Sequence, residues 1–344
     1  MPKINVLIAG STGYIGVELV KLLLNHRYVK IKYLCGNSSV GKNIAEYDKT
    51  LKNKRLPKII RFHSKYLNDV DIIFTALPNG EAQQISKILL KKNTLIDLAA
   101  DFRLEKTSEY LKWYKQKHKA PNQIKNSIYS LPEISGNKIK KYKIIACPGC
   151  YPTSILLPLI PLIKNNLIKI NNIIVDSKSG YSGGGRKIHK KYKKKNLYES
   201  TSAYGVGFHR HNSEIEQTLK KYTNKRLEFT FTPHLSPMFR GILSTIYLDL
   251  KKNINTKKIH SVLNKFYKKH KFVKVKKFNS LLSTNDVINT NYCYISVCKS
   301  KYNNKLILLS AIDNLIKGGA GQGVQNMNIL KNFNITEGLK WKKF

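Results

Sequence analysis

The pattern of apolar and polar residues changes character near residue 150. Before that point, short apolar runs of the kind found in buried parallel strands alternate with helical stretches. The strands expected here are residues 5–9, 31–35, 71–76, 94–98 and 143–146, and the helices include residues 17–24 and, less clearly marked, 111–118. This alternation predicts an α/β domain with a doubly wound sheet over residues 1–148, which binds its ligand at the carboxyl ends of the strands.

Beyond residue 150 the strand signals come close together and few helices separate them. Residues 149–311 therefore predict an α+β domain with a mixed or antiparallel sheet. Its expected strands are residues 172–176, 228–231, 242–250, 272–275, 292–297 and 306–310; its expected helices are 155–162 and 256–269, and a last helix follows at 322–333.

A glycine-rich turn lies between the first strand and the first helix. The run reads Gly10-Ser11-Thr12-Gly13-Tyr14-Ile15-Gly16. Glycines in this position permit a tight turn and let the backbone approach a pyrophosphate at the helix N-terminus. Strand, turn and helix in this order predict a Rossmann-type dinucleotide-binding domain; the alternative is a glycine turn without a ligand.

The end of the second strand indicates which dinucleotide binds. NAD enzymes usually carry an acidic residue there for the ribose 2′-hydroxyl. This chain has Ser38, Ser39 and then Lys42 instead. Hydroxyls and a cation suit a 2′-phosphate, so we expect NADP as the cofactor.

Cys150 follows a Pro-Gly turn and precedes a long apolar helical stretch. A thiol at a helix N-terminus faces unpaired backbone N–H groups, which favour the nucleophilic thiolate. The alternative is a buried cysteine that packs as a small hydrophobe. A nucleophilic cysteine needs a proton-transfer partner, and His209 and His211 would share one face of an extended segment. We expect Cys150 as the nucleophile and His209 as the acid/base, with His211 as the second choice.

These segments resemble the N-acetyl-γ-glutamyl-phosphate reductase family, which is related to aspartate-semialdehyde dehydrogenase. The resemblance covers nearly the whole chain, and Gly-Cys-Tyr-Pro-Thr at 149–153 and His-Arg-His at 209–211 are its most specific parts. It also includes the runs at 10–16, 74–80, 96–104, 129–133, 178–186, 231–235, 240–242 and 313–318. One departure is Cys147, where the family usually has Asn.

The resemblance implies reduction of N-acetylglutamyl 5-phosphate to the 5-semialdehyde in arginine biosynthesis, with NADPH as reductant and Cys150 carrying a thioester. It implies that residues 312–344 pack back on the first domain and that the second sheet forms the interface of a homodimer or homotetramer. The residues expected to hold the cofactor are Gly10, Ser11, Thr12, Gly13, Tyr14, Ile15, Gly16, Ser38, Ser39, Lys42, Pro78, Asn314, Lys317 and Gly318. Those expected to hold the substrate are Arg103, Ser182, Gly183, Arg186 and His211.

Alternative roles stay open for several of these residues. Arg103, proposed for the phosphate, could instead form a structural ion pair with Asp97 or Asp101, and Asn314 and Lys317 could cap a helix. Aspartate-semialdehyde dehydrogenase chemistry is the nearest alternative activity. A thioredoxin-like use of Cys147 and Cys150 would leave the glycine turn and the histidines without a role.

The net charge of +42 also allows a protein of another class, one that binds nucleic acid. Only eight of the 62 basic residues are Arg, however, and a protein that clamps phosphates should use Arg more heavily. We therefore interpret the lysines as solvated surface, with the run 187–195 as the densest, and expect no nucleic-acid partner.

Composition places the chain among proteins of a reducing compartment. Five scattered cysteines do not form a disulfide framework, and no second cysteine pair stands at zinc-site spacing, so no metal is expected. No apolar run reaches membrane-spanning length, and the first residues have no signal-peptide pattern. We expect a cytoplasmic protein without a membrane partner.

Overall fold

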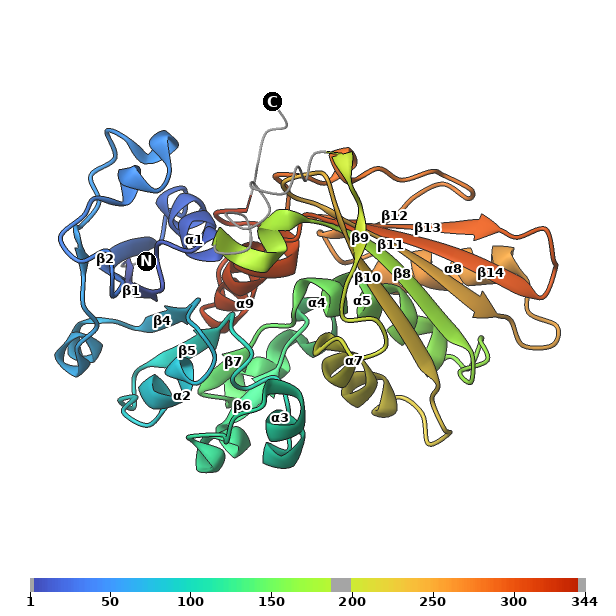
Figure 1. The fold of residues 1–344 in the computed structure, drawn as a ribbon, viewed down its shortest axis with the longest axis horizontal. Helices are drawn as coiled ribbons and strands as arrows, with labels where there is room; N and C mark the ends of the chain where they lie inside the picture. The colour runs from blue at the N-terminus through green and yellow to red at the C-terminus, as the bar shows by residue number, and fades with distance from the viewer. Residues whose placement is uncertain (1–2, 187–198, 340–344) are drawn as a thin grey trace. The chain divides into compact units, whose positions relative to one another are not determined.

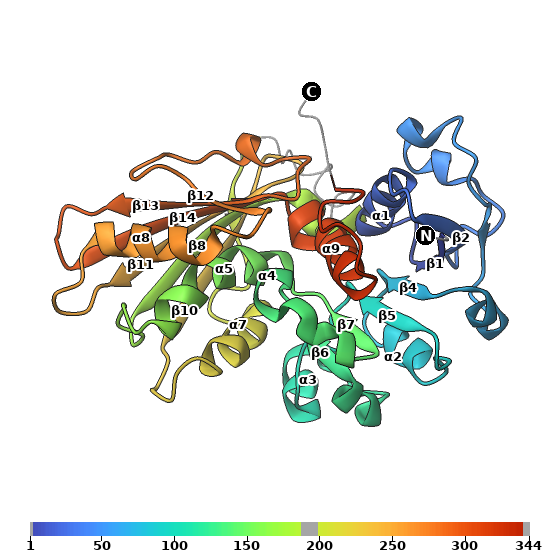
Figure 2. The same ribbon diagram turned by 180° about the vertical axis from the view of Figure 1, so that it is seen from behind.

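The computed structural model describes residues 3–186 and 199–339, and the basic run 187–195 lies outside these described residues. The described residues form two compact units: the first contains residues 3–148 and 319–339, and the second contains residues 149–186 and 199–318 (Figures 1 and 2). Each unit is built around its own seven-stranded sheet.

The first sheet is parallel throughout, with strand order β3-β2-β1-β4-β5-β7-β6. Its strands are β1 (Ile4–Ala9), β2 (Val29–Cys35), β3 (Ile59–Ile60), β4 (Ile72–Thr75), β5 (Thr94–Asp97), β6 (Ser127–Tyr129) and β7 (Ile144–Ala146). All five strands expected in this half are present. The sequence pattern missed β3 and β6, which have two and three residues and are too short to show a period. The strand order reverses beside β1, as in dinucleotide-binding sheets.

Helices of the first unit are α1 (Tyr14–Leu24), α2 (Glu81–Ser86), α3 (Thr107–Tyr114), α4 (Pro132–Ser135) and α9 (Gly321–Leu330). The helix expected at 111–118 begins earlier and ends at Tyr114. It ends there because Lys115 adopts a left-handed backbone with φ 57° and returns its N–H to the carbonyl of Leu111.

Helix α9 is buried from Gly321 to Asn328, although four of its ten residues carry polar amides. Three of its amides have partners in the first unit: Asn326 accepts from the Ser130 hydroxyl at 2.8 Å, Asn328 contacts the His26 ring at 2.9 Å, and Gln325 donates to Glu133 at 2.8 Å. Polar groups that find partners can be buried at little cost, whereas unpaired ones cannot. These bonds attach the C-terminal helix to the first unit.

The second sheet is mixed, with order β12-β13-β14-β11-β8-β10-β9. Its strands are β8 (Ile173–Gly180), β9 (Ser202–Ala203), β10 (Phe229–Ser236), β11 (Ile242–Asp249), β12 (Val273–Val275), β13 (Cys293–Lys299) and β14 (Lys305–Ile312). The six strands and the two helices expected here are present, and β9 is additional. The helices are α5 (Cys150–Lys164), α7 (His211–Lys220) and α8 (Thr256–Tyr267), with α5 and α8 against one face of the sheet (Figure 2).

Short 3₁₀ segments complete the described chain, together with one π-helical turn, η9 (Ile316–Ala320). The 3₁₀ segments are η1 (Ile44–Glu46), η2 (Lys49–Leu51), η3 (Ser64–Asp69), η4 (Pro121–Asn126), η5 (Gly136–Lys141), η6 (Tyr181–Gly184) and η8 (Thr284–Asp286).

Helix α5 continues through two internal prolines. Pro161 has no N–H for the carbonyl of Leu157, four residues earlier, and an unsatisfied buried carbonyl would be costly. The Tyr267 hydroxyl supplies the missing donor at 2.5 Å. This contact joins α8 to α5 and keeps the helix that begins at Cys150 intact.

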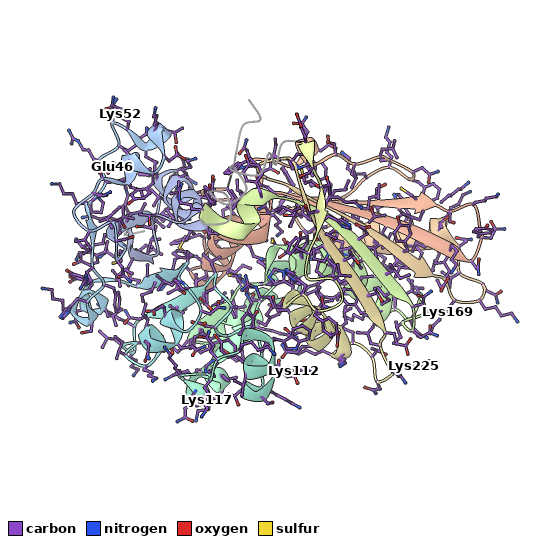
Figure 3. All side chains as sticks on the ribbon, in the orientation of Figure 1. Glu46, Lys52, Lys112, Lys117, Lys169 and Lys225 are labelled. Atoms are coloured by element: carbon purple, nitrogen blue, oxygen red, sulfur yellow. The ribbon has the colours of Figure 1, made fainter. Side chains whose placement is uncertain are left out.

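Lysines account for most of the positive charge. Those labelled in Figure 3, such as Lys52, Lys112 and Lys117, are exposed and extend from the ribbon. Among the described residues, no helix combines the length and the apolar character that crossing a bilayer requires.

Candidate active site

The glycine turn after β1 has the shape of a dinucleotide site. Gly10 has φ 84°, and a Cβ there would lie 2.3 Å from the carbonyl oxygen of Ala76. A Cβ on Gly16 would lie 2.2 Å from the Gly10 carbonyl, whereas one on Gly13 would meet only that oxygen, at 3.6 Å. The N-cap residue Gly13 makes no side-chain cap, and no acidic residue lies in the first turn of α1. The start of α1 is therefore suited to an anionic pyrophosphate.

A pocket of about 160 Å³ lies at the carboxyl ends of β1 and β2. It is lined by Ala9, Gly10, Cys35, Gly36, Asn37, Phe62, Leu77, Glu81, Gln84, Ile85 and Ile88. Gly10 belongs both to this pocket and to the turn, so one ligand can occupy the two. The apolar walls suit a flat ring such as adenine.

The expected ribose-selecting residues are placed differently from one another. Ser38 is exposed, and Lys42 is exposed with its ammonium 3.9 Å from Glu46. Ser39 is buried, and its hydroxyl has no hydrogen-bond partner among the described residues. Pro78 follows β4 and is exposed. Lys42 is thus accessible to a 2′-phosphate, but its ammonium group also forms an ion pair with Glu46.

Cys150 is the first residue of α5, and Gly149 is its N-cap without a side-chain cap. The thiol is half-buried. Gly318 lies directly against it, because a Cβ on Gly318 would be 2.6 Å from the Cys150 Cβ. Gly318 therefore lies next to Cys150, and any side chain at position 318 would displace the cysteine.

The two histidines are brought together, although the segment is not extended as expected. His209 lies in a turn, and His211 is the first residue of α7. The turn folds because the His211 N–H donates to Nδ1 of His209 at 3.2 Å. The ring centroids are 4.7 Å apart, and both rings contact Tyr151, the residue after Cys150, at 5.6 and 5.9 Å.

His209 is enclosed by aromatic rings, including Tyr204 and Phe231 at 5.5 and 5.6 Å. Burial, assisted by the charge of Arg210, lowers the pKa of His209 to about 4. Its ring is therefore neutral near pH 7 and available to accept a proton.

Glu214 is a site residue that the sequence analysis did not single out. Its carboxylate is fully buried; one oxygen accepts the Gly149 N–H at 3.0 Å and the other lies 3.8 Å from Nε2 of His211. It links the turn before Cys150 to His211 and can fix the orientation of that ring. Its contact with His211 could have been expected from the sequence, because residues three positions apart lie on the same face of a helix.

Arg103 supports the other side of the cysteine turn. Its Nε donates to the carbonyl of Cys147 at 2.8 Å and its Nη2 to that of Leu98 at 3.0 Å. Cys147 itself is fully buried, accepts from Asn326 at 3.5 Å, and has its pKa raised to about 12 by burial. This thiol is protonated near neutral pH and is no second nucleophile.

Asp97 and Asp101 lie beside Arg103 in the first unit. Burial and the Asp101 charge raise the pKa of Asp97 to about 7, while the charge of Arg103 opposes this shift. Asp97 accepts from Thr75 at 2.7 Å, and its backbone carbonyl accepts the Cys147 N–H at 2.8 Å. Asp101 accepts the Gly80 N–H at 2.7 Å.

The segment after β14 meets the expected substrate loop. Asn314 donates to the Ser182 hydroxyl at 3.0 Å and accepts the Gly241 N–H at 2.7 Å. Asp313, fully buried, accepts the N–H groups of Leu315 and Ile316 and contacts Arg240 at 3.2 Å. Arg240 and Asp313 thus stabilise this turn. The sequence alone assigned no role to either residue.

The expected glycine-rich loop is η6, a 3₁₀ turn. Ser182 is buried and Gly183 exposed within it, and Arg186 follows half-buried. Lys317 lies in the π-helical turn η9, fully buried, with its ammonium 5.9 Å from the Phe272 ring centre. Within the described residues, no cluster of side chains suits a metal ion.

Comparisons with known proteins agree with this geometry. Residues 5–142 match the semialdehyde dehydrogenase NAD-binding domain, and residues 150–314 match the semialdehyde dehydrogenase dimerisation domain. An N-acetyl-gamma-glutamyl-phosphate reductase from Clostridium botulinum is 44% identical over 339 residues, covering 98% of each chain. The chain belongs to the N-acetyl-γ-glutamyl-phosphate reductase family. A probable chloroplastic member from Arabidopsis thaliana is 40% identical over 96% of this chain and 83% of its own.

Two solved structures share this fold at a lower sequence identity. Aspartate semialdehyde dehydrogenase II from Vibrio cholerae, complexed with ASA, superposes with a TM-score of 0.71 at 15% identity, covering 96% of this chain and 99% of its own. The Candida albicans enzyme with NADP gives 0.66 at 17% identity over 97% and 99%. These confirm the expected α/β fold with a second sheet-containing domain.

Proposed function

We propose that this protein reduces N-acetyl-L-glutamyl 5-phosphate to N-acetyl-L-glutamate 5-semialdehyde and phosphate, with NADPH, in arginine biosynthesis. The observation that carries the proposal is Cys150 as the first residue of a helix without a side-chain cap, in a chain with a glycine turn shaped for a dinucleotide. Family membership supplies the substrate, and the geometry supports the residue roles below.

Cys150 acts as the nucleophile. Its thiolate attacks the carbonyl carbon of the acyl phosphate, the C–O bond to phosphate breaks, and phosphate leaves with the bonding electrons. The positive end of the α5 helix dipole, where the backbone N–H groups of the first turn lie, stabilises the thiolate and the oxyanion that forms on the carbonyl. The product is a thioester on Cys150, and Gly318 leaves room for it because it has no side chain.

NADPH, when bound, supplies the hydride that converts the thioester to the aldehyde oxidation level. Gly10, Gly13 and Gly16 shape the turn for its pyrophosphate, with Ser11, Thr12, Tyr14 and Ile15 completing the turn and the first helical residues. Ser38, Ser39, Lys42 and Pro78 are proposed around the ribose end. Asn314, Lys317 and Gly318 are proposed around the nicotinamide.

Proton transfer is assigned to His209. Its neutral ring accepts the proton of the Cys150 thiol in the direction of semialdehyde oxidation and returns it in the direction of reduction. His211, oriented by Glu214, is proposed to hold the substrate. Ser182, Gly183 and Arg186 are proposed for the substrate carboxylate. Arg103 is proposed for the phosphate, and its bonds to the carbonyls of Cys147 and Leu98 would fix its position there.

We further propose a homodimer or homotetramer in the cytoplasm, joined through the second sheet. Support comes from the sheet face away from α5 and α8, where Ile174 and Tyr247 are paired in register and are 42% and 44% exposed. A partner can cover this face, and the match of residues 150–314 to the semialdehyde dehydrogenase dimerisation domain supports this location for the interface.

The deciding assay is phosphate-dependent reduction of NADP with N-acetylglutamate semialdehyde. We expect turnover with this aldehyde and little or none with aspartate semialdehyde. Preference for aspartate semialdehyde would assign the protein to the other branch of the superfamily. No reduction of NADP or NAD with either aldehyde would refute the proposed function.

A further inference from the structure

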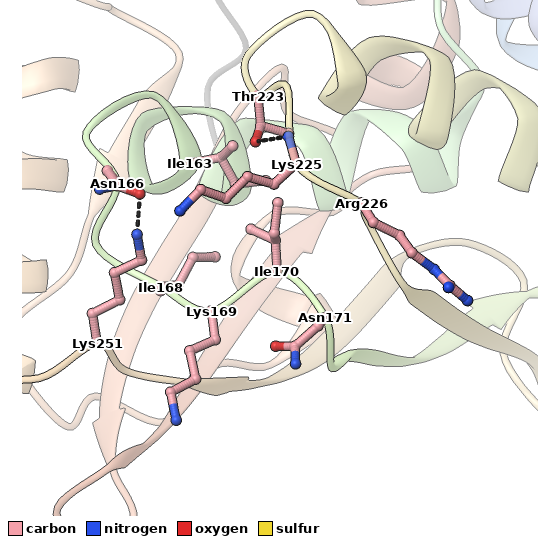
Figure 4. A pocket seen from close by; sticks show the side chains of 10 residues that line it. All are labelled: Ile163, Asn166, Ile168, Lys169, Ile170, Asn171, Thr223, Lys225, Arg226 and Lys251. Atoms are coloured by element: carbon pink, nitrogen blue, oxygen red, sulfur yellow. Dashed lines mark hydrogen bonds between the residues drawn. The ribbon is translucent and has the colours of Figure 1, made fainter.

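A second pocket, of about 220 Å³, lies at the end of α5 opposite Cys150 (Figure 4). Ile163 from the last turn of the helix and Asn166 just after it line one side. A 15-residue helix is about 22 Å long, so this pocket is separate from the catalytic thiol. None of the residues assigned to catalysis or to cofactor binding lines it.

The pocket combines an apolar floor with a cationic rim. Ile163 and Ile168 are buried and Ile170 is half-buried. Four of the lining residues are cations, Lys169, Lys225, Arg226 and Lys251, and the remaining ones, Asn166, Asn171 and Thr223, are polar and uncharged. The described residues that line the pocket include no acid.

Two of these ammonium groups point into the same space. Figure 4 shows Lys225 lying over the isoleucines and Lys251 reaching Asn166, whereas Lys169 and Arg226 point away. Lys251 donates to the Asn166 side-chain oxygen. Burial and, after it, the charge of Lys225 lower the pKa of Lys251.

Arg226 of the rim and two cations outside the pocket have acidic partners. Arg226 contacts Glu228 at 3.2 Å, Lys220 contacts Glu216 at 3.7 Å, and Lys305 contacts Asp249 at 2.5 Å. Within the described structure, Lys225 and Lys251 form no ion pair with an acidic residue. Like charges held at one pocket repel each other, and an anion between them would relieve this repulsion.

We propose that this pocket binds a small phosphorylated molecule. Its phosphate lies between the ammonium groups of Lys225 and Lys251 and next to the Asn166 amide, and its carbon portion lies on Ile163, Ile168 and Ile170. Lysine binds phosphate as a point charge, and the apolar floor adds affinity for a carbon skeleton. The inference does not depend on the proposed catalytic function.

Calorimetric titration with phenyl phosphate, at constant ionic strength, tests this site. The probe joins a phosphate to a flat apolar ring, and inorganic phosphate serves for comparison. The catalytic site also binds phosphate, so the pocket is identified from the difference between variants. The pocket variant is Lys225→Gln/Lys251→Gln, and the matched control is Lys112→Gln/Lys117→Gln, which removes two exposed lysines of the first unit.

We expect wild type and control to bind phenyl phosphate more tightly than inorganic phosphate at a site outside the catalytic centre. The pocket variant should bind it at least about tenfold more weakly, because two charge-assisted hydrogen bonds are lost. Melting temperature and turnover should match wild type. A second variant, Lys225→Glu, places a carboxylate in the pocket and should abolish binding there.

Equal binding by wild type and the pocket variant would overturn the proposal, as would an equal loss in the control variant. Duplex DNA is the last probe. If the pocket variant loses affinity for DNA but not for phenyl phosphate, the cations serve a polyanion surface and the small-molecule site is refuted.

Discussion

Two turns in this chain have the same backbone and lead to different chemistry. One joins β1 to α1, the other joins β7 to α5, and in each a glycine is the helix N-cap. Gly13 has φ −67° and ψ 164°, Gly149 has φ −65° and ψ 163°, and neither helix has a side-chain cap. Both turns therefore present backbone N–H groups to a negative charge.

The difference lies in what accompanies the glycine. After Gly149 comes Cys150, and the Gly149 N–H is taken by the buried carboxylate of Glu214. After Gly13 comes Tyr14, a residue without a nucleophilic thiol, and the first turns of both helices lack an acidic residue of their own. One turn can therefore accept a diffusible anion, whereas the other supplies its own nucleophile. The comparison teaches that the shared backbone conformation makes both helix starts favourable for negative charge. The first side chain of the helix then determines whether the turn binds an anion or supplies a nucleophile.

The largest expected effect comes from Cys150→Ser. Turnover should fall by at least about a thousandfold, because a serine hydroxyl in this position is not ionised near neutral pH. NADPH affinity, measured by fluorescence titration, should stay near the wild-type value. Cys147→Ala is the matched control: a buried thiol with a pKa near 12 should contribute little to the rate. Turnover above a few per cent in Cys150→Ser would contradict the covalent mechanism.

His209→Asn should lower turnover by about 100-fold, the usual contribution of a positioned acid/base group. His211→Asn should mainly raise KM for the substrate, and the opposite pattern would reverse the two assignments. In semialdehyde oxidation, the acid limb of the kcat/KM profile should fall near pH 4, because His209 must be unprotonated. His209→Asn should remove this limb.

The free energy of unfolding should also depend on pH through His209. Its folded pKa of about 4 lies below the ordinary value of 6.5, so the unfolded chain binds the proton first as the pH falls. The stability that the neutral His209 ring contributes to the folded state is therefore fully present above pH 6.5. It is lost as the pH falls from 6.5 to about 4. Melting curves of His209→Asn should show a shallower loss of stability over this window than wild type.

Gly13→Ser should make the first turn more like an ordinary capped helix. The serine has room, since a Cβ at this position meets only one atom, at 3.6 Å. Its hydroxyl would take the N–H groups that a pyrophosphate needs, so the Kd for NADPH should rise about tenfold. The melting temperature should be unchanged or slightly raised. Unaltered NADPH affinity would show that the start of α1 does not hold the cofactor.

The smallest effect concerns cofactor choice. NADPH should be preferred over NADH, and Lys42→Glu should narrow that preference by a few-fold, as expected for an exposed charge. Glu46→Gln should widen it, because Glu46 lies 3.9 Å from the Lys42 ammonium. The ratio of kcat/KM for the two cofactors measures both changes. A preference for NADH in the wild type would refute the role of Lys42.

Much of the fold could be predicted because its signals are local. The expected strands of both sheets, the glycine turn and the helix after Cys150 each depend on consecutive residues. Strands β3 and β6 could not be predicted, because pairs and triplets of residues owe their conformation to neighbouring strands. The end of α3 depends on a left-handed Lys115, which propensity does not favour.

The site was less predictable because its contacts join distant segments. The proximity of Gly318 to Cys150 and the pairing of Asn314 with Ser182 involve residues more than 130 positions apart. The segment around His209 forms a turn, although the spacing of the two histidines favoured an extended strand. The hydrogen bond from the His211 backbone N–H to the His209 ring stabilises this turn. Glu214 stands only three residues after His211 in the sequence, yet its contact with Gly149 exists only in the folded unit.

The central claim is that Cys150 carries the acyl group. Mixing the protein with N-acetylglutamyl phosphate in the absence of NADPH tests it most directly. We expect a burst of about one phosphate per catalytic site and, by mass spectrometry, an N-acetylglutamyl group on the peptide that contains Cys150. Neither should appear in Cys150→Ser. Turnover with NADPH but no phosphate burst without it, or an acyl group on another residue, would contradict the account.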